Sequence, residues 1–134
     1  MPSIVFSAQS SSSFDDVLAR TTEALKAQGF GIISDIDVSA TLQNKLGVQR
    51  PRYRILGACA PGYALQALDL DPHIGALLPC NVVVREDAAS GQIAVDFMNP
   101  TAVLGLIDKP EVHAIAKEVC AKLMQARDAL QHTA

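Results

Sequence analysis

The chain of 134 residues contains no tryptophan, four phenylalanines and two tyrosines. Proteins that bind single-stranded nucleic acids stack bases on aromatic side chains, so a stacking surface of that kind is not expected here. Basic residues are also outnumbered, with 11 lysines and arginines against 14 acidic residues and a formal net charge of −3. Because basic residues drive binding to phosphates, this balance argues against a nucleic-acid partner.

Long apolar runs are missing as well. No stretch approaches the roughly 18 uninterrupted apolar residues of a membrane span, so no membrane partner is expected. The segment from Met1 to Phe6 lacks the basic region and the long apolar region of a secretory signal. These features together predict a cytoplasmic protein.

Cysteine is scarce, and its number is odd. Three cysteines do not form the disulfide framework of a small secreted domain, and in a reducing compartment they rest as thiols or bind a metal. The sequence has no Cys-x-x-Cys motif, and a structural zinc site needs four ligands. It also lacks a Ser-His-Asp order and a glycine-rich phosphate loop, which lowers the case for a hydrolase or a nucleotide-binding protein. The sequence does not identify a cofactor.

The residues that are present describe a globular chain. Hydrophobic residues make up 49% of the sequence and charged residues 19%, which suits one domain over residues 1–134 with a core of Ile, Leu, Val and Ala. We see no internal repeat and no linker.

Residue patterns predict the order of helices and strands. Runs rich in β-branched residues predict strands, and apolar residues at helical spacing predict helices. The predicted strands span 3–8, 31–38, 53–58, 77–86 and 92–98, and the predicted helices span 13–28, 41–46, 61–70 and 110–131, with a short turn over 72–76. This order predicts an α+β fold in two layers, with helices covering a five-stranded antiparallel sheet.

Two of these segments carry expectations about which side chains are buried. In strand 31–38 the alternation predicts that Ile36 faces the core and that Asp35 and Asp37 face solvent. The two aspartates could suit a hard cation, but a solvated strand face is the favoured interpretation. In helix 61–70, Leu65 and Leu68 are expected to mark the inner face.

Cys59 and Cys80 are the best candidates for a site, because each lies beside a proline at the boundary of a predicted strand. If strands 53–58 and 77–86 run parallel, the two thiols lie a full strand apart. The tight turn after the second strand favours antiparallel neighbours instead, which places both thiols at one edge. Cys59 also precedes the helix that begins near Pro61, and a helix N-terminus stabilises a thiolate.

Other residues are secondary candidates. Lys45, Tyr53, Pro61 and Asn81 are candidate ligand-binding residues near the cysteine segments. His73 lies between the two cysteines and is a candidate third metal ligand, although a surface histidine is the favoured interpretation. Cys120 is expected to be a small packing residue of the last helix.

Several segments resemble one known protein family over about residues 13–130. They are Gly29-Phe30-Gly31, Ile36-Asp37-Val38, Thr41-Leu42, Lys45-Leu46-Gly47, Ile55-Leu56-Gly57-Ala58-Cys59-Ala60-Pro61, Ala67-Leu68 and Leu77-Leu78-Pro79-Cys80-Asn81-Val82-Val83-Val84. These segments resemble the domain-of-unknown-function 302 family, to which no activity is assigned. The sequence departs from the family pattern at Ala60, where asparagine is usual.

The resemblance has implications for fold and assembly. It implies a compact α+β domain with helices on an antiparallel sheet, related in shape to the half-domain of the TATA-binding protein. It also implies a small bacterial or archaeal protein that forms a homodimer. The relation to a DNA-binding half-domain is one of shape only, and it conflicts with the acidic charge.

Three functions remain open from the sequence. The first is thiol-based redox or sulfur chemistry, in which Cys59 attacks, Cys80 resolves and Lys45 or Tyr53 assists. The second is binding of a soft metal such as copper(I) by the two thiols. The third is a non-catalytic small-molecule-binding or dimeric assembly module, in which the cysteines are packing residues.

Overall fold

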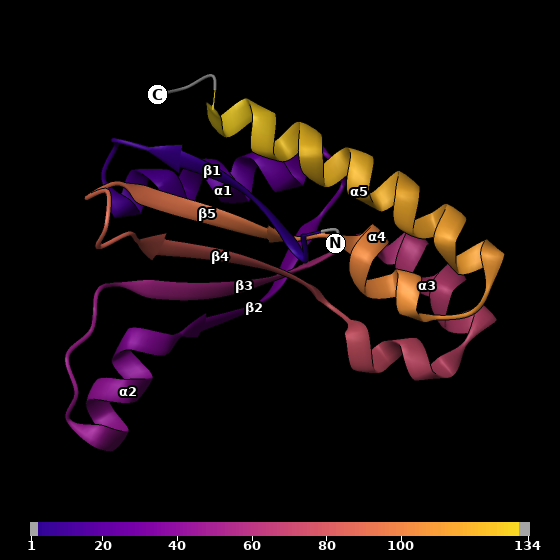
Figure 1. Ribbon diagram of the computed structural model, residues 1–134, viewed down its shortest axis with the longest axis horizontal. Coiled ribbons are helices and arrows are strands. Elements are labelled where there is room, and N and C mark those ends of the chain that lie inside the picture. Colours follow the sequence, from indigo (N-terminus) through magenta and orange to yellow (C-terminus); the bar gives the residue numbers. More distant parts are fainter. Residues whose placement is uncertain (1–2, 132–134) are drawn as a thin grey trace.

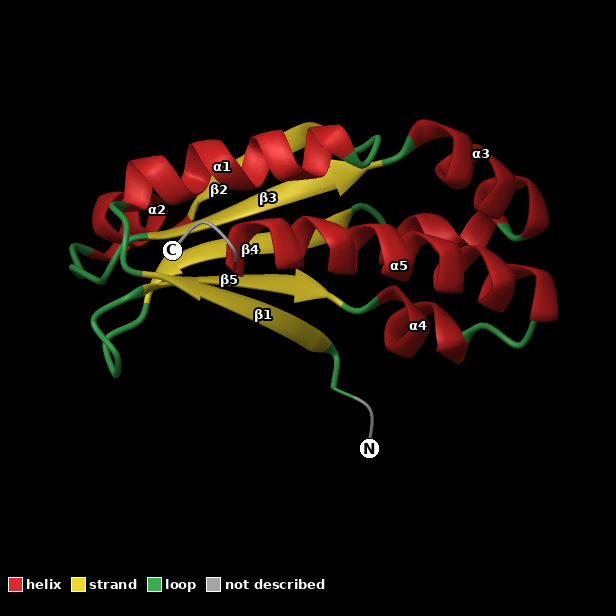
Figure 2. Cartoon of the chain, turned by 90° about the horizontal axis from the view of Figure 1, so that it is seen from above, coloured by secondary structure: helices red, strands yellow, loops and turns green. Residues whose placement is uncertain are grey.

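A computed structural model describes residues 3–131, which form a five-stranded antiparallel sheet with the two longest helices on one face (Figures 1 and 2). The strands lie in the order β1-β5-β4-β3-β2. Their bounds are β1 Val5–Ser10, β2 Gly31–Asp37, β3 Tyr53–Cys59, β4 Cys80–Glu86 and β5 Ile93–Met98. The predicted α+β class and the predicted antiparallel sheet are therefore confirmed.

Helices occupy the connections between the strands and the end of the chain. They are α1 Phe14–Ala27, α2 Val38–Leu46, α3 Pro61–Leu70, α4 Pro100–Val103 and α5 Pro110–Gln131, with short 3₁₀ helices η1 Pro72–Leu77 and η2 Leu104–Leu106. Within residues 3–131 none of the helices is long and apolar enough to cross a membrane.

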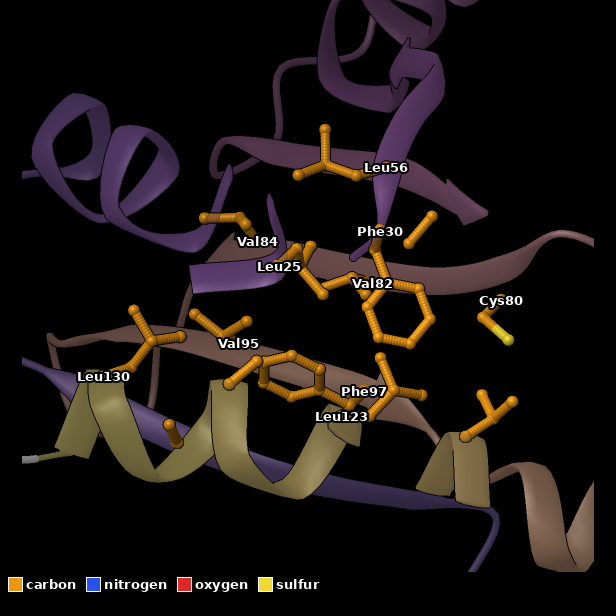
Figure 3. Close-up of a cluster of buried hydrophobic side chains, with 14 of the residues drawn as sticks. Leu25, Phe30, Leu56, Cys80, Val82, Val84, Val95, Phe97, Leu123 and Leu130 are labelled. Carbon is orange, nitrogen blue, oxygen red and sulfur yellow. The ribbon is translucent and has the colours of Figure 1, made fainter. Parts of the chain in front are cut away.

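The two longest helices, α1 and α5, lie side by side over the same face of the sheet (Figure 2). Helix α1 begins where the sequence predicts it, because the Ser13 hydroxyl accepts a hydrogen bond from the Asp16 backbone N–H. Their apolar faces meet alternate residues of the central strands, such as Leu56, Val82 and Phe97 (Figure 3). The core is therefore a layer of aliphatic and phenylalanine side chains between one sheet face and two helices.

The prediction for strand β2 was wrong about Ile36, which does not face the core, although Asp35 is exposed as predicted. A bulge between Ile32 and Ser34 shifts the register, so that Asp35 lies opposite the buried Leu56 and Asp37 lies opposite Arg54. Ile36 falls on the other face and is 51% exposed. One extra residue in the strand is enough to reverse the faces of all residues that follow it.

Helix α2 projects from the β2–β3 end of the sheet, and α3 and α4 lie beyond the opposite end (Figures 1 and 2). Helix α2 begins at Val38, three residues earlier than predicted, because the Asp37 side chain caps it by accepting a hydrogen bond from the Ala40 N–H at 2.9 Å. The candidate functional site lies at the α3 end of the sheet, and α2 lies at the other end.

Candidate functional site

The register of β3 and β4 places both candidate cysteines at the same end of the sheet. The strands are antiparallel neighbours, and Ala58 lies directly opposite Cys80. Cys59 ends β3, and Cys80 begins β4 after a cis peptide bond between Leu78 and Pro79. All three cysteines are free thiols. The predicted antiparallel pairing of these strands is therefore confirmed, and no disulfide joins the thiols.

A cavity of about 330 Å³ lies at this end of the sheet, and both Cys59 and Cys80 line it. Helix α3 forms one wall, α5 and η2 form another, and the ends of β2, β3 and β4 complete it. The remaining lining residues are Phe30, Ile33, Ala58, Ala60, Tyr63, Ala64, Ala67, Leu68, Gly75, Leu78, Pro79, Leu104, Ile115 and Val119. Figure 3 shows Cys80 at the end of the core cluster.

The cavity wall is almost entirely apolar. Among the described residues that line it, Tyr63 carries the only polar side chain aside from the two thiols, and none is a lysine, arginine, histidine, aspartate or glutamate. Ile33, which is 65% exposed, and Leu68, which is also exposed, belong to the wall, so the cavity opens to solvent between β2 and α3. The site therefore offers an accessible hydrophobic space that contains two sulfur atoms.

The two thiols differ in their surroundings. The Cys59 side chain is half-buried, whereas Cys80 is only 6% exposed and forms no hydrogen bond within the described part of the chain. Burial, and to a smaller extent the electrostatic influence of nearby Cys59, raises the pKa of the Cys80 thiol from 9.0 to about 11. Cys80 is therefore protonated at neutral pH.

The N-terminus of α3 lies next to Cys59. Pro61 occupies the first helical position, and Ala60 stands at the cap without a side-chain hydrogen bond. Among the described residues, no acceptor faces the backbone N–H groups of Gly62 and Tyr63, whereas the Ala64 N–H donates to the Ala60 carbonyl at 3.0 Å. Asparagine at position 60 would supply a capping side chain, so alanine leaves these N–H groups available.

The secondary candidate residues do not gather at this cavity. Lys45 is exposed on α2, and Tyr53 begins the strand that Cys59 ends, roughly 20 Å away at about 3.4 Å per residue. Asn81 is exposed and lies opposite Gly57, on the sheet face away from the core. Pro61 is exposed at the start of α3 and supports the wall only through the helix that it begins.

The candidate metal ligands are separated from the thiols or already paired. His73 is exposed, and its Nδ1 lies 2.9 Å from an Asp71 oxygen. Asp35 accepts a hydrogen bond from Arg54 at 2.9 Å, and Asp37 lies 4.0 Å from the same guanidinium. Residues 3–131 contain no group of three or more His, Cys, Asp or Glu side chains placed to hold a metal ion.

Sequence reasoning found the two cysteines but missed the wall around them. Leu65 and Leu68 were expected to form the inner face of α3, yet Leu65 is 62% exposed and the buried residue is Ala67. The informative signal was the recurrence of Ala60, Ala64 and Ala67 at helical spacing. Small side chains on the inward face of a helix leave space between the helix and the sheet, and the cavity occupies that space.

Comparison with known proteins gives a family and a fold. The model of the family "Domain of unknown function DUF302" matches residues 6–130. The chain is similar to a solved structure, the uncharacterized conserved protein DUF302 from Bacillus stearothermophilus. The two share 26% sequence identity with a TM-score of 0.88, over 96% of this chain and 99% of the other. A comparison with curated proteins found none that matches. Because the family model covers nearly the whole sequence, the chain belongs to the DUF302 family.

Proposed function

We propose that the protein binds a small, neutral, apolar molecule in the cavity between α3, α5 and the ends of β2, β3 and β4. The observation that carries this proposal is the composition of the wall. Its described residues combine aliphatic and aromatic side chains with no ionisable group other than two thiols and one phenol. Ligand sites are typically concave and mostly apolar, with few polar groups.

The size of the cavity limits the ligand. An apolar cavity of about 150 Å³ holds one benzene molecule, so a space of about 330 Å³ suits two fused rings or a chain of about ten carbon atoms. This lies at the lower end of the range of known ligand sites, roughly 300–1,000 Å³. The ligand is therefore a small molecule and not a long lipid.

The wall also sets the charge of the ligand. Transferring an ionised group into an apolar site without a partner costs several kcal/mol, on the order of the whole binding energy of a small ligand. Within residues 3–131, no cationic or anionic side chain lines the cavity to offset that cost. We therefore expect neutral molecules to bind and their charged analogues to be excluded.

The same burial weighs against the two thiol roles predicted from sequence. Resolving a disulfide and binding copper(I) both use the deprotonated sulfur. Cys80, whose pKa is raised to about 11 by burial, holds its proton at neutral pH. Ligand binding makes no such demand, and in a reducing cytoplasm both thiols remain free to line the cavity.

A matched pair of fluorescent probes tests the proposal. N-phenyl-1-naphthylamine is neutral, and 1-anilinonaphthalene-8-sulfonate has the same rings with one negative charge. We expect the neutral probe to bind at least about tenfold more tightly, which corresponds to about 1.4 kcal/mol. Titration of each probe by fluorescence gives the two affinities.

Two substitutions on α3 locate the binding. Ala67→Phe places a ring inside the cavity and should abolish binding of the neutral probe. Leu65→Phe adds a ring to the exposed side of the same helix and should leave the affinity unchanged. Equal affinity for both probes, or binding that survives Ala67→Phe in a folded protein, would contradict the proposal.

We also propose that the protein forms a homodimer through the sheet face that α1 and α5 leave uncovered. Ile36, Ile55 and Val83 lie in one cross-strand row on that face, and all three are exposed or half-buried. A two-fold axis through this row would pack the apolar patch of one protomer against the same patch of its partner. The patch lies on a different face from the core and leaves the cavity accessible.

A further inference from the structure

We infer that the ligand is an uncharged amphiphile, whose apolar chain fills the cavity and whose carboxamide head group lies in a polar hollow beside it. This inference rests on the proposed ligand-binding function and adds the chemical class of the ligand. Two features carry it. The cavity and the hollow share part of their walls, and the polar side chains around the hollow have no partners among the described residues.

The hollow lies next to the cavity, where α3 and α5 are side by side (Figure 2). Ala60 and Tyr63 line both spaces. The other residues that line the hollow are Gln28, Gly29, Pro61, Gly62, Gln66, Glu118 and Lys122. The two spaces are therefore adjacent, and a chain that fills the cavity can extend its end group toward the hollow.

The spacing of residues on α5 explains why the two spaces adjoin. Ile115 and Val119 line the cavity, whereas Glu118 and Lys122 line the hollow. Each residue of the second pair follows one of the first pair by three positions, and residues three apart are neighbours on a helix surface. The helix thus presents an apolar strip to the cavity and a polar strip beside it to the hollow.

The polar side chains of the hollow are unpaired within residues 3–131. Glu118 and Lys122 have opposite charges and are one helical turn apart, yet neither forms an ion pair or a side-chain hydrogen bond with a described residue. The side-chain amides of Gln28 and Gln66 and the Tyr63 hydroxyl also lack such a bond. Donors and acceptors with balanced charge therefore surround one hollow.

This arrangement selects the head group. A polar group that leaves water needs hydrogen-bond partners, and the apolar cavity offers few, so the head group of an amphiphile lies where the hollow supplies them. A carboxamide both donates and accepts hydrogen bonds. An ionised head group would meet a like charge, because a carboxylate faces Glu118 and an ammonium group faces Lys122. The hollow therefore favours the amide.

Two molecules of nearly equal size test this inference. Nonanamide and 2-decanone have the same alkyl chain on a carbonyl group, but the amide carries NH2 where the ketone carries a methyl group. The ketone is the more hydrophobic molecule, so a wholly apolar site would bind it more tightly. We expect nonanamide to displace N-phenyl-1-naphthylamine at least as effectively as 2-decanone does. Weaker displacement by nonanamide would overturn the inference.

Paired variants of α5 locate the head group. Glu118→Met combined with Lys122→Met keeps the net charge and removes two partners from the hollow. It should weaken binding of nonanamide by about tenfold, as the loss of one or two hydrogen bonds does, and leave the affinities for 2-decanone and the fluorescent probe unchanged.

A second pair on the same helix is the control. Glu111 and Lys117 are exposed and lie outside the hollow, so Glu111→Met combined with Lys117→Met should alter none of the three affinities. If nonanamide binds the hollow variant as tightly as the wild type, or loses as much affinity in the control variant, the head group does not lie in the hollow.

Charged analogues test the neutrality of the head group. Nonanoate and nonylammonium have chains of similar length and carry one negative and one positive charge at neutral pH. We expect each to displace the probe less effectively than nonanamide. Displacement by either ion that equals or exceeds that of nonanamide would overturn the assignment of an uncharged head group.

The probe and the ketone separate this inference from the proposed function. If both bind the wild type and are excluded by Ala67→Phe, but nonanamide does not respond to the substitutions in the hollow, ligand binding stands and the amide head group is wrong. If the probe does not bind the wild type, or binds Ala67→Phe unchanged, the proposed function and the inference both fail.

Discussion

At the scale of single residues, Gly57 shows how one absent side chain allows the cavity end of the sheet to close. Gly57 lies in β3 on the sheet face away from the core, opposite Ser34. A Cβ at this position would overlap the Ser34 hydroxyl and would lie 2.8 Å from Cγ of Pro79. The proline ring cannot rotate away, so the glycine allows Pro79 to pack across β3 next to Cys80.

We therefore expect Gly57→Ala to destabilise the protein by about 1–3 kcal/mol, as overpacking in a close-packed region does. Gly62→Ala is the matched control, because nothing lies within 4 Å of its added Cβ and alanine favours a helix. Urea denaturation of both variants gives the free energies of unfolding. A Gly57→Ala protein as stable as the wild type would show that β3 and Pro79 are not in close contact.

The buried thiol of Cys80 makes a second prediction, which concerns pH. The folded pKa of about 11 lies above the ordinary value of 9.0, so the folded state retains the proton where the unfolded state loses it. Its contribution to stability is complete below pH 9 and is lost as the pH rises toward 11, by at most about 3 kcal/mol.

The measurement compares wild type with Cys80→Ala at pH 8 and at pH 10.5. At each pH, the difference between the two free energies of unfolding cancels the contributions of tyrosines and lysines, which titrate in the same range in both proteins. We expect the stability advantage of the wild type to shrink at the higher pH. A constant difference would show that Cys80 is solvated in the folded state.

At the scale of helices and strands, α2 and α3 begin in opposite ways. The Asp37 side chain caps α2, whereas α3 begins at Ala60 without a side-chain cap. Hydrogen bonds from the Ala40 backbone and the Ser39 hydroxyl, together with nearby Arg54, lower the pKa of Asp37. Helix α2 therefore has a capped N-terminus, and α3 begins without a side-chain cap.

Removing the cap of α2 should loosen that helix alone. We expect Asp37→Ala to cost about 0.5–2 kcal/mol and to speed amide hydrogen exchange within Val38–Leu46. Asp37→Ser keeps a capping oxygen and should retain most of the protection. Because the pKa of Asp37 is lowered on folding, its contribution should be present above pH 3.8 and be lost as the pH falls below it.

At the scale of the whole molecule, the sheet has two faces with different roles. One face holds the core under α1 and α5, and the cavity lies at the end of that layer (Figure 2). The other face carries an apolar row of Ile36, Ile55 and Val83, followed along the same row by Asp96. Asp96 is paired with Arg85 at 2.7 Å, so the face divides into an apolar part and a charged part.

The division predicts where two copies meet. Ile55→Lys should place two like charges in the centre of the proposed dimer interface and produce a monomer, because buried unpaired charges are costly. Leu65→Lys, on the exposed side of α3, should leave the assembly unchanged. Light scattering coupled to size exclusion gives the masses. A monomeric wild type, or a dimeric Ile55→Lys, would contradict this interface.

Much of the fold follows from local features of the sequence. Ser13 before Phe14 and the apolar residues at helical spacing mark α1, and the tight turn after Glu86 pairs β4 with β5. Strand β2 is the counterexample. A regular period of two predicts its faces wrongly, because the bulge between Ile32 and Ser34 depends on how β2 pairs with β3 and is not visible in the alternation itself.

Local sequence patterns were sufficient to predict the helices and strands, their order and the placement of two thiols at strand ends, because propensity, capping and turn chemistry act between residues a few positions apart. The surroundings of those thiols depend instead on long-range packing. The cavity depends on the distance between α3, α5 and the sheet, and its exposed wall residue Ile33 is presented by a bulge. Such distances arise from side chains that are remote in sequence and pack together only in the folded chain.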